Sequence, residues 1–231
     1  MSNERRAIVT GSSSGIGKAT AEALLNEGWR VIGFDLAPST IVNEEFTAVR
    51  VDLCDGAASE AAAVSAGRAD ALIHAAGVLR VGSLATLQPS DGELMWRLHV
   101  ESITRIAKVV VPAMTASREG RIVVIGSRIA QGKAARSQYA ATKAALVGLA
   151  RSWAAEVVAT GVTVNVVSPA ATQTNMLDDP ARESETPVVP PLGRLIRPEE
   201  VAALVLFLLS PAAAAITGQD IQICGGASLP R

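Results

Sequence analysis

Short β-branched runs alternate along the chain with longer Ala-rich segments whose apolar residues recur at helical spacing. Parallel strands buried on both faces read as continuous apolar runs, and their connecting helices cover both faces of the sheet. The pattern predicts strands at Arg6–Thr10, Arg30–Asp35, Thr47–Val51, Ala71–His74, Arg121–Ile125, Thr163–Val167 and Asp220–Ile223. It predicts helices at Gly15–Glu27, Gly56–Ser65, Asp91–Ser117, Ser137–Thr160 and Pro198–Leu209. We therefore expect an α/β fold with a doubly wound, parallel, seven-stranded sheet of Rossmann type.

Length and composition favour one domain spanning residues 1–231, because no repeat or Pro/Gly-rich linker divides the chain. The 21 Lys and Arg residues nearly balance the 22 Asp and Glu residues, so no basic excess indicates a nucleic-acid partner. Cys54 and Cys224 form no CxxC or metal-ligand pair, and we expect no metal. Without a signal-like start or a membrane-length apolar stretch, we expect a cytoplasmic protein with no membrane partner.

A glycine- and serine-rich turn joins the first predicted strand to the first helix. Such a turn lets the backbone approach a pyrophosphate, which the helix N-terminus also attracts. The spacing is GxxxGxG rather than GxGxxG, and the alternative is a flexible turn without a ligand. Its position directly after the first strand favours dinucleotide binding, since doubly wound sheets bind ligands at the carboxyl ends of their strands. The expected contacts are Gly11, Ser13, Ser14, Gly15, Ile16 and Gly17.

Asp35 ends the second predicted strand and favours NAD over NADP as the cofactor. Its carboxylate can accept hydrogen bonds from the adenosine ribose and would repel a 2′-phosphate, with no compensating cation at Ser14 or Leu36. The alternative is an ordinary strand-end aspartate. Further strand ends are expected to contact the cofactor through Asp52, Leu53, Ala75, Ala76 and Gly77.

Tyr139 and Lys143 stand four residues apart, on one face of a predicted helix, and Ser127 follows the fifth predicted strand. A phenol is a poor base at neutral pH, but a nearby ammonium stabilises the phenolate. Ser127 can donate a hydrogen bond to a substrate oxygen on which charge develops. The alternative is a helix tyrosine with a solvated lysine one turn on. Because Tyr139 is the only tyrosine and shares the chain with a dinucleotide turn, we favour proton transfer.

These motifs together resemble the short-chain dehydrogenase/reductase family along nearly the whole chain, from Thr10–Gly17 to Ile216–Gln219. The resemblance implies that Tyr139 is the general acid/base, that Lys143 binds the nicotinamide ribose and tunes Tyr139, and that Ser127 positions the substrate oxygen. It also implies that Pro169, Thr172 and Thr174 hold the nicotinamide carboxamide.

The chain departs from the family pattern at four places. His74 and Ala75 replace two asparagines, Ala170 replaces a glycine, and Cys224 replaces an aspartate before two glycines. His99 stands where the family usually carries a catalytic asparagine, which is thought to hold a water that links the lysine to solvent. We expect His99 to take part in catalysis by binding that water and relaying protons. The alternative is a packed histidine that satisfies the helix backbone locally.

A proline-broken segment at 175–197 is predicted to form a lid over the substrate, with a plain surface connection as the alternative. Met176, Leu177, Val188 and Val189 are expected to form an apolar wall, and Arg182 or Arg194 to meet an acid group. The helices at 91–117 and 137–160 are expected to build a homotetramer, as related enzymes commonly do, although helices buried within one subunit would look the same. The candidate contacts are Trp96, Val109, Val110, Leu146, Leu149 and Trp153.

The leading interpretation is an NAD(H)-dependent oxidoreductase that interconverts a small-molecule secondary alcohol and a ketone by hydride transfer. One alternative is an NADPH-dependent reductase of 3-oxoacyl carrier thioesters, which Asp35 and the formal net charge of −1 disfavour. Another is a dinucleotide-binding regulator or scaffold without turnover, which the presence of Ser127, Tyr139 and Lys143 disfavours.

Overall fold

The computed structural model describes residues 4–177 and 188–230. Seven parallel strands form one sheet in the order β3-β2-β1-β4-β5-β6-β7. The strands are β1 (Arg6–Thr10), β2 (Arg30–Asp35), β3 (Phe46–Arg50), β4 (Ala71–His74), β5 (Gly120–Ile125), β6 (Val162–Pro169) and β7 (Asp220–Ile223). The predicted α/β fold with a doubly wound, parallel, seven-stranded sheet is thereby confirmed.

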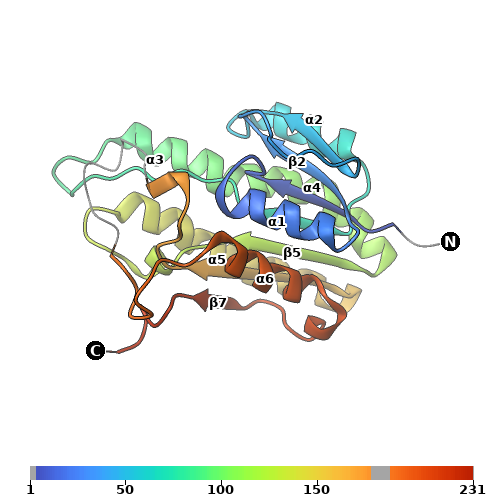
Figure 1. Cartoon of the computed structure of the whole chain (residues 1–231). Coiled ribbons are helices and arrows are strands. Elements are labelled where there is room, and N and C mark those ends of the chain that lie inside the picture. The colour runs from blue at the N-terminus through green and yellow to red at the C-terminus, as the bar shows by residue number, and fades with distance from the viewer. Residues whose placement is uncertain (1–3, 178–187, 231) are drawn as a thin grey trace.

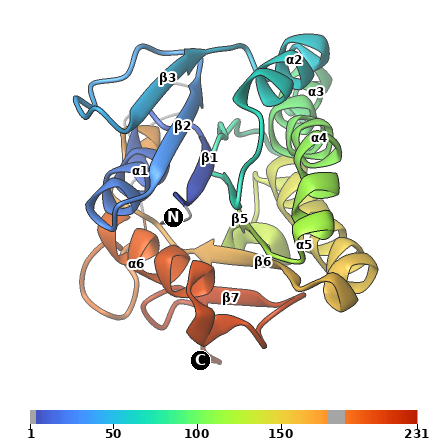
Figure 2. The same cartoon turned by 90° about the vertical axis from the view of Figure 1, so that its right-hand side faces the viewer.

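Helices cover both faces of the sheet, as Figure 2 shows, with α1 and α6 on one side and α2, α4 and α5 on the other. The main helices are α1 (Gly15–Asn26), α2 (Gly56–Ala66), α3 (Pro89–Trp96), α4 (Ser102–Ser117), α5 (Ser137–Val157) and α6 (Pro198–Leu209). Each face has its own apolar core. One core packs sheet residues such as Leu72 against Ile106 and Leu146, and the other packs Ile73 against Leu24 and Val205.

The strand order reverses at β1, the dark blue strand nearest the N-terminus in Figure 1, which pairs with β2 on one side and β4 on the other. Connections from β1 and β4 therefore leave towards opposite sides, and a crevice opens beyond the carboxyl ends of these strands. Thr10 and His74 are register partners at those ends. The residues that follow each strand consequently meet at one edge of the sheet.

The helix predicted at Asp91–Ser117 has a different internal structure. Helix α3 begins at Pro89, a five-residue π-helical segment follows at Arg97–Glu101, and α4 then ends at Ser117. The backbone N–H of Ser102 bonds to the carbonyl of Arg97, five residues back, so the turn is one residue wider than an α-turn. Single π-turns inside helices are frequent at functional sites, and this one contains His99.

Other helix and strand ends differ from their predicted positions by a few residues. The largest difference is at Ser137–Thr160, where α5 ends at Val157 and a 3-10 turn, Val158–Thr160, completes the segment. Gly161, with φ of 79°, ends that turn in the left-handed region. None of the helices in residues 4–177 and 188–230 is long and apolar enough to cross a membrane.

Candidate functional site

A cavity of about 1040 Å³ lies at the carboxyl ends of the strands. It extends from Asp35 after β2, past the turn after β1, to Tyr139 and Lys143 on α5. The predicted site residues that line it are Gly11, Ser14, Gly15, Ile16, Gly17, Asp35, Asp52, Leu53, Ala75, Ala76, Gly77, Ser127, Tyr139, Lys143, Pro169, Thr172 and Thr174. Two predicted residues, Ser13 and His99, are not among the lining residues. Nearly all of the predicted set therefore comes together in one place.

The turn after β1 is shaped by its glycines. Gly11 has a φ of 69°, and a side chain there would approach the backbone nitrogen of Ala76 to 2.8 Å. A side chain at Gly17 would overlap the carbonyl oxygen of Gly11. The N-terminus of α1 carries no side-chain cap from Ser14 and no acidic residue in its first turn. Its N–H groups and the positive end of its dipole are thus suited to a phosphate in the cavity.

Backbone donors hold Asp35 in place at the far end of the cavity. One carboxylate oxygen accepts the N–H of Ser13 at 2.9 Å, and the other accepts the N–H of Ala37 at 2.9 Å. The neighbouring cations have other partners, since Lys18 Nζ donates to Thr40 Oγ1 and Arg50 Nε donates to the Leu36 carbonyl. Ser13 therefore contributes to the site by orienting Asp35, while its own Oγ donates to Ala37.

Ser127, Tyr139 and Lys143 lie buried at the opposite end, with 7%, 7% and 4% of their surfaces exposed. Ser127 Oγ accepts the N–H of Ile129 at 3.1 Å. Lys143 Nζ donates to the Ile125 carbonyl at 2.8 Å and lies 5.8 Å from the centre of the Tyr139 ring. Burial lowers the pKa of Lys143 from 10.5 to about 7. An anion next to this lysine would restore its preference for the charged form.

Two buried histidines connect the sheet to α5, the helix that carries Tyr139 and Lys143. His74 Nε2 lies 3.1 Å from the carbonyl of His99, which can only accept, so this nitrogen carries a proton. His74 Nδ1 then accepts the hydroxyl of Thr10 at 2.9 Å. The same Thr10 oxygen accepts the N–H groups of Ala75 and Ala76. His74 thereby joins β1, β4 and the π-segment at one point.

The His99 ring joins the π-segment to α5 and to the loop after β4. Its Nε2 accepts the N–H of Val78 at 3.0 Å, and its Nδ1 lies 2.8 Å from Thr142 Oγ1. Thr142 in turn donates to the carbonyl of Tyr139 at 2.9 Å. The ring also packs edge-on against Tyr139, with the ring centres 5.6 Å apart. Both imidazole nitrogens of His99 thus have partners inside the protein.

Burial keeps both histidines neutral. It lowers the pKa of His74 from 6.5 to about 3 and that of His99 well below 6.5, and the nearby Lys143 charge adds to both effects. The His99 side chain does not hydrogen-bond only within its own helix, which was the alternative interpretation. Its side chain instead bridges three separate segments.

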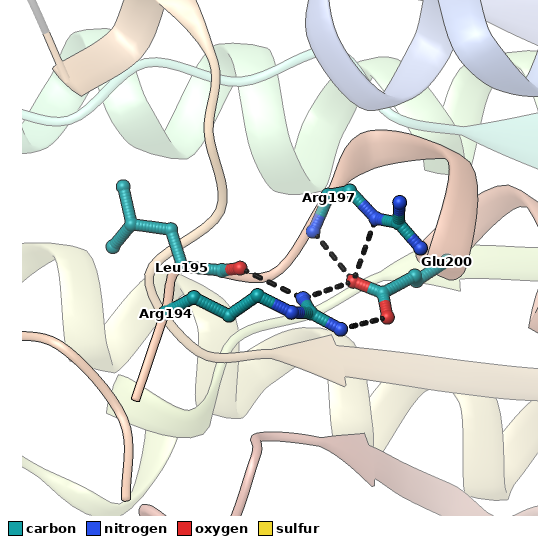
Figure 3. Close-up of polar contacts among 4 residues, drawn as sticks. All are labelled: Arg194, Leu195, Arg197 and Glu200. Atoms are coloured by element: carbon teal, nitrogen blue, oxygen red, sulfur yellow. Dashed lines mark hydrogen bonds and ion pairs between the residues drawn. The ribbon is translucent and has the colours of Figure 1, made fainter. Parts of the chain in front are cut away.

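Apolar residues cover the end of the cavity that holds Ser127, Tyr139 and Lys143, here called the reacting end. The predicted wall residues Met176, Leu177, Val188 and Val189 all line it, and Leu79 and Met95 pack with Tyr139. Arg182 lies outside the described residues. Arg194 does not line the cavity, because its guanidinium forms two hydrogen bonds with Glu200, which also accepts the N–H of Arg197 (Figure 3). The expectation that Arg194 meets an acid group of the substrate is therefore wrong.

Sequence reasoning missed Arg128, which lines the cavity directly after Ser127. Lys133 and Arg136 also line it, from the segment between β5 and α5. The available signal was their position between the strand-end Ser127 and the helix that carries Tyr139. Among the described residues, no group of three or more His, Cys, Asp or Glu side chains is arranged to hold a metal ion.

Residues 11–228 match the family model described as Enoyl-(Acyl carrier protein) reductase. A solved structure named as a short chain dehydrogenase/reductase family protein is 33% identical, with a TM-score of 0.89 and 98% of each chain covered. The chain belongs to the short-chain dehydrogenase/reductase family. The resemblance inferred from its motifs is thereby confirmed, and the chain is an NAD(P)-dependent oxidoreductase of this family.

Named relatives within the short-chain dehydrogenase/reductase family differ in their substrates. The 3-oxoacyl-[acyl-carrier-protein] reductase FabG of Vibrio cholerae is 36% identical over 234 residues, covering 95% of this chain and 96% of the relative. Oxidoreductase UcpA of Escherichia coli O157:H7 is 33% identical, covering 98% and 95%. The ligand-free aldohexose dehydrogenase of Thermoplasma acidophilum is 26% identical, with a TM-score of 0.90 and 99% and 95% covered.

A nicotinamide dinucleotide, the cofactor of this family, fits the cavity. Side chains at Gly11 or Gly17 would collide with backbone, so the turn keeps a surface open against which a pyrophosphate can lie. The uncapped N-terminus of α1 supplies donors for it, and Asp35 supplies an acceptor at the adenosine end. The family relationship thus gives the reaction class. The residues of the site bear on the substrate and on the choice between NAD and NADP.

Proposed function

We propose that this protein is an NAD(H)-dependent oxidoreductase that interconverts a small-molecule secondary alcohol and a ketone. The observation that carries the proposal is one continuous cavity with Asp35 at one end and buried Ser127, Tyr139 and Lys143 at the other. The Asp35 carboxylate favours ribose hydroxyls and repels a 2′-phosphate. Lys18 and Arg50 bond to other groups, and neither pairs with Asp35. The negative charge of Asp35 is therefore not compensated by these cations, which supports the preference for NAD.

Catalysis rests on proton transfer at the Tyr139 oxygen. The bound cofactor supplies or accepts the hydride. In the oxidation direction, the Tyr139 oxygen takes the hydroxyl proton of the alcohol, and in reduction it returns a proton to the ketone oxygen. The Lys143 ammonium stabilises the phenolate and the ribose contact, and Ser127 Oγ donates to the substrate oxygen. Pro169, Thr172 and Thr174 are proposed to hold the nicotinamide carboxamide.

His99 is proposed to position these groups rather than to relay protons. Its two nitrogens already hold Val78 and Thr142, and a relay would have to break one of these bonds and charge a buried ring. A Thr142→Val variant breaks the connection to α5 and leaves His99 intact. We expect kcat to fall, with the KM for the cofactor and the pH dependence of kcat unchanged. A loss of the acid limb of the pH–rate profile in His99→Asn would instead support the relay.

A second candidate is reduction of a 3-oxoacyl carrier thioester, which the 36% identity to FabG favours. Carrier proteins dock on a basic surface, and such enzymes favour NADPH. Asp35 at the adenosine end and the formal net charge of −1 support the alcohol–ketone reaction instead.

The remaining expectations concern assembly and surroundings. We propose a single domain in which the segment at 175–197 closes over the substrate, since its described residues 175–177, 188, 189 and 191 line the cavity. We also propose a cytoplasmic homotetramer. Exposed Trp96 supports a helix contact between subunits, whereas Val110 and Leu146 are buried in their own subunit and cannot contribute to one. Light scattering at working concentration tests the tetramer, and a monomer would contradict it.

Absorbance of the reduced nicotinamide tests the function directly. Secondary alcohols, sugars, hydroxy acids and a 3-oxoacyl thioester are assayed with both cofactors. We expect NAD-dependent turnover of alcohols that falls about 10²- to 10⁴-fold in Tyr139→Phe, with cofactor affinity retained. Turnover independent of Tyr139 would overturn the mechanism, and thioester reduction with NADPH alone would establish the second candidate.

A further inference from the structure

Besides Lys143 on α5, the end of the cavity that holds Tyr139 has cations from the segment between β5 and α5. Arg128, Lys133 and Arg136 all line the cavity, and Arg136 is only 2% exposed. Arg128 follows Ser127 directly, and Arg136 precedes Tyr139 by three residues. Among the described lining residues the carboxylates are Asp35 and Asp52, both at the adenosine end. Among the residues that the structure describes, the two ends of the cavity therefore carry charges of opposite sign.

Arg128 is the cation best suited to bind a ligand. Its Nε is shielded from solvent and has no hydrogen-bond partner in the part of the chain that the structure describes. No ion pair of Arg128 occurs within residues 4–177 and 188–230. A buried N–H without an acceptor is unfavourable. Arg121 Nε and Gln222 Oε1 are also buried without a partner among the described residues, but of the three only Arg128 lines the cavity. An acceptor on a molecule in the cavity would remove this cost.

We propose that Arg128 binds an anionic group, a carboxylate or a phosphate, on the substrate, with Lys133 and Arg136 adding positive charge around it. The substrate is then the anion of a hydroxy acid or hydroxyalkyl phosphate, and the product is the corresponding oxo compound. This assignment rests on the proposed alcohol–ketone reaction. A planar guanidinium suits both kinds of anion, because its N–H groups match two oxygens at once.

Burial distinguishes this cation group from a docking surface for an acidic protein. Arg136 is almost fully buried and Arg128 is half-buried in the cavity wall, whereas Lys133 is exposed, so a small molecule in the cavity reaches Arg128 and Arg136 more readily than a protein surface does. A small molecule whose hydroxyl lies at Ser127 and Tyr139 places its neighbouring group at the wall formed by Arg128. The anion consequently sets both the affinity and the orientation of the reacting carbon.

Matched pairs of alcohols with NAD test the proposal on the full-length enzyme. 3-Hydroxybutyrate is compared with its methyl ester, and glycerol 3-phosphate with glycerol. We expect at least one anion to exceed its neutral partner about 100-fold in kcat/KM. Arg128→Met should remove that preference by lowering kcat/KM for the anion, with little change for the neutral compound. Arg128→Lys should restore part of it, since it keeps the charge but loses the paired donors.

Arg68→Met is the control, because Arg68 is an exposed arginine before β4, at the amino end of the sheet. It should leave every ratio unchanged. An anion preference that persists in Arg128→Met overturns the assignment to Arg128. If Arg128→Met fails to fold, wild-type enzyme decides the question: fluorescence titration of its NADH complex with each oxo anion and its neutral partner should favour the anion, and equal binding overturns the proposal. Tyr139-dependent turnover of neutral alcohols without anion preference would leave the proposed function intact and remove this inference alone.

Discussion

The two ends of the cavity are built from different materials. At the adenosine and pyrophosphate end, the backbone makes most of the contacts. Gly11 and Gly17 let two segments of main chain pass close together, and two backbone N–H groups hold Asp35. At the reacting end, side chains reach between separate elements: His99 meets Thr142 of α5, and Lys143 Nζ donates to the Ile125 carbonyl of β5. We therefore expect substitutions at the first end to impair function through steric conflict, and substitutions at the second end through the loss of single polar atoms.

The largest effect on cofactor binding is expected at the backbone-built end. Gly17→Ala places a methyl group against the carbonyl oxygen of Gly11. The turn must shift, and we expect the dissociation constant for NADH to rise at least about 100-fold, because the phosphate contacts depend on its shape. Gly148→Ala is the control, since a side chain at that position on α5 meets nothing within 4 Å. Fluorescence titration measures both, and normal NADH binding by Gly17→Ala would break the comparison.

Asp35 is the side chain at the cofactor end that we expect to select NAD over NADP. Asp35→Asn keeps the size but removes the charge, so we expect kcat/KM with NAD to fall about 10- to 100-fold and the preference over NADP to shrink. Asp55→Asn is the matched control, because Asp55 also accepts two backbone N–H groups, at the start of α2 and away from the cavity. Steady-state kinetics with both cofactors separates the two, and an unchanged ratio in Asp35→Asn would mean that the backbone alone selects the cofactor.

The histidines make the reacting end sensitive to acid. Their pKa values, about 3 for His74 and well below 6.5 for His99, mean that below pH 6.5 the unfolded chain binds protons that the native chain does not. The free energy of unfolding should therefore fall as pH drops from 6.5 towards 3, by about 1.4 kcal/mol per pH unit for His74, and His99 adds to the fall.

His74→Asn should reduce the slope of the free energy of unfolding against pH by about the contribution of one proton. Urea denaturation at a series of pH values measures this slope. The chain has 2 histidines, so no other imidazole contributes. Equal slopes for wild type and variant would contradict the assignment of a neutral His74.

The smallest effect is expected at Arg194, outside both ends of the cavity. Its ion pair with Glu200 is exposed to solvent, which screens it, although the contact holds the pKa of Glu200 at about 2. Arg194→Met should leave thermal stability nearly unchanged and the KM of every substrate unaltered. Glu200→Ala should be more costly, because it also removes the acceptor for the N–H of Arg197. A raised substrate KM in Arg194→Met would contradict this prediction and indicate that Arg194 contacts the substrate.

The same contrast explains what could be predicted from the sequence. The strands, the dinucleotide turn and the Tyr139–Lys143 pair follow from local spacing, so they were predictable to within a few residues. The contacts of His74 with the His99 carbonyl join residues 25 positions apart through a π-turn, which no periodicity indicates. The cavity position of Arg128 depends on how the loop after β5 folds, because a cation next to a serine carries no such information by itself.

The position of β1 has a consequence for how the chain reaches this structure. Although β1 is made first, its inner neighbour is β4, and Ala7 must wait for Ala71, its register partner, before that side of the strand is paired. The edge strand β7 pairs with β6 only near the end of the sequence. Such non-local parallel pairing is slow, since loop closure precedes the gain in contacts. A nascent chain that ends before β4 therefore leaves one edge of its earliest strand open. During synthesis this open edge must be kept from pairing with other chains.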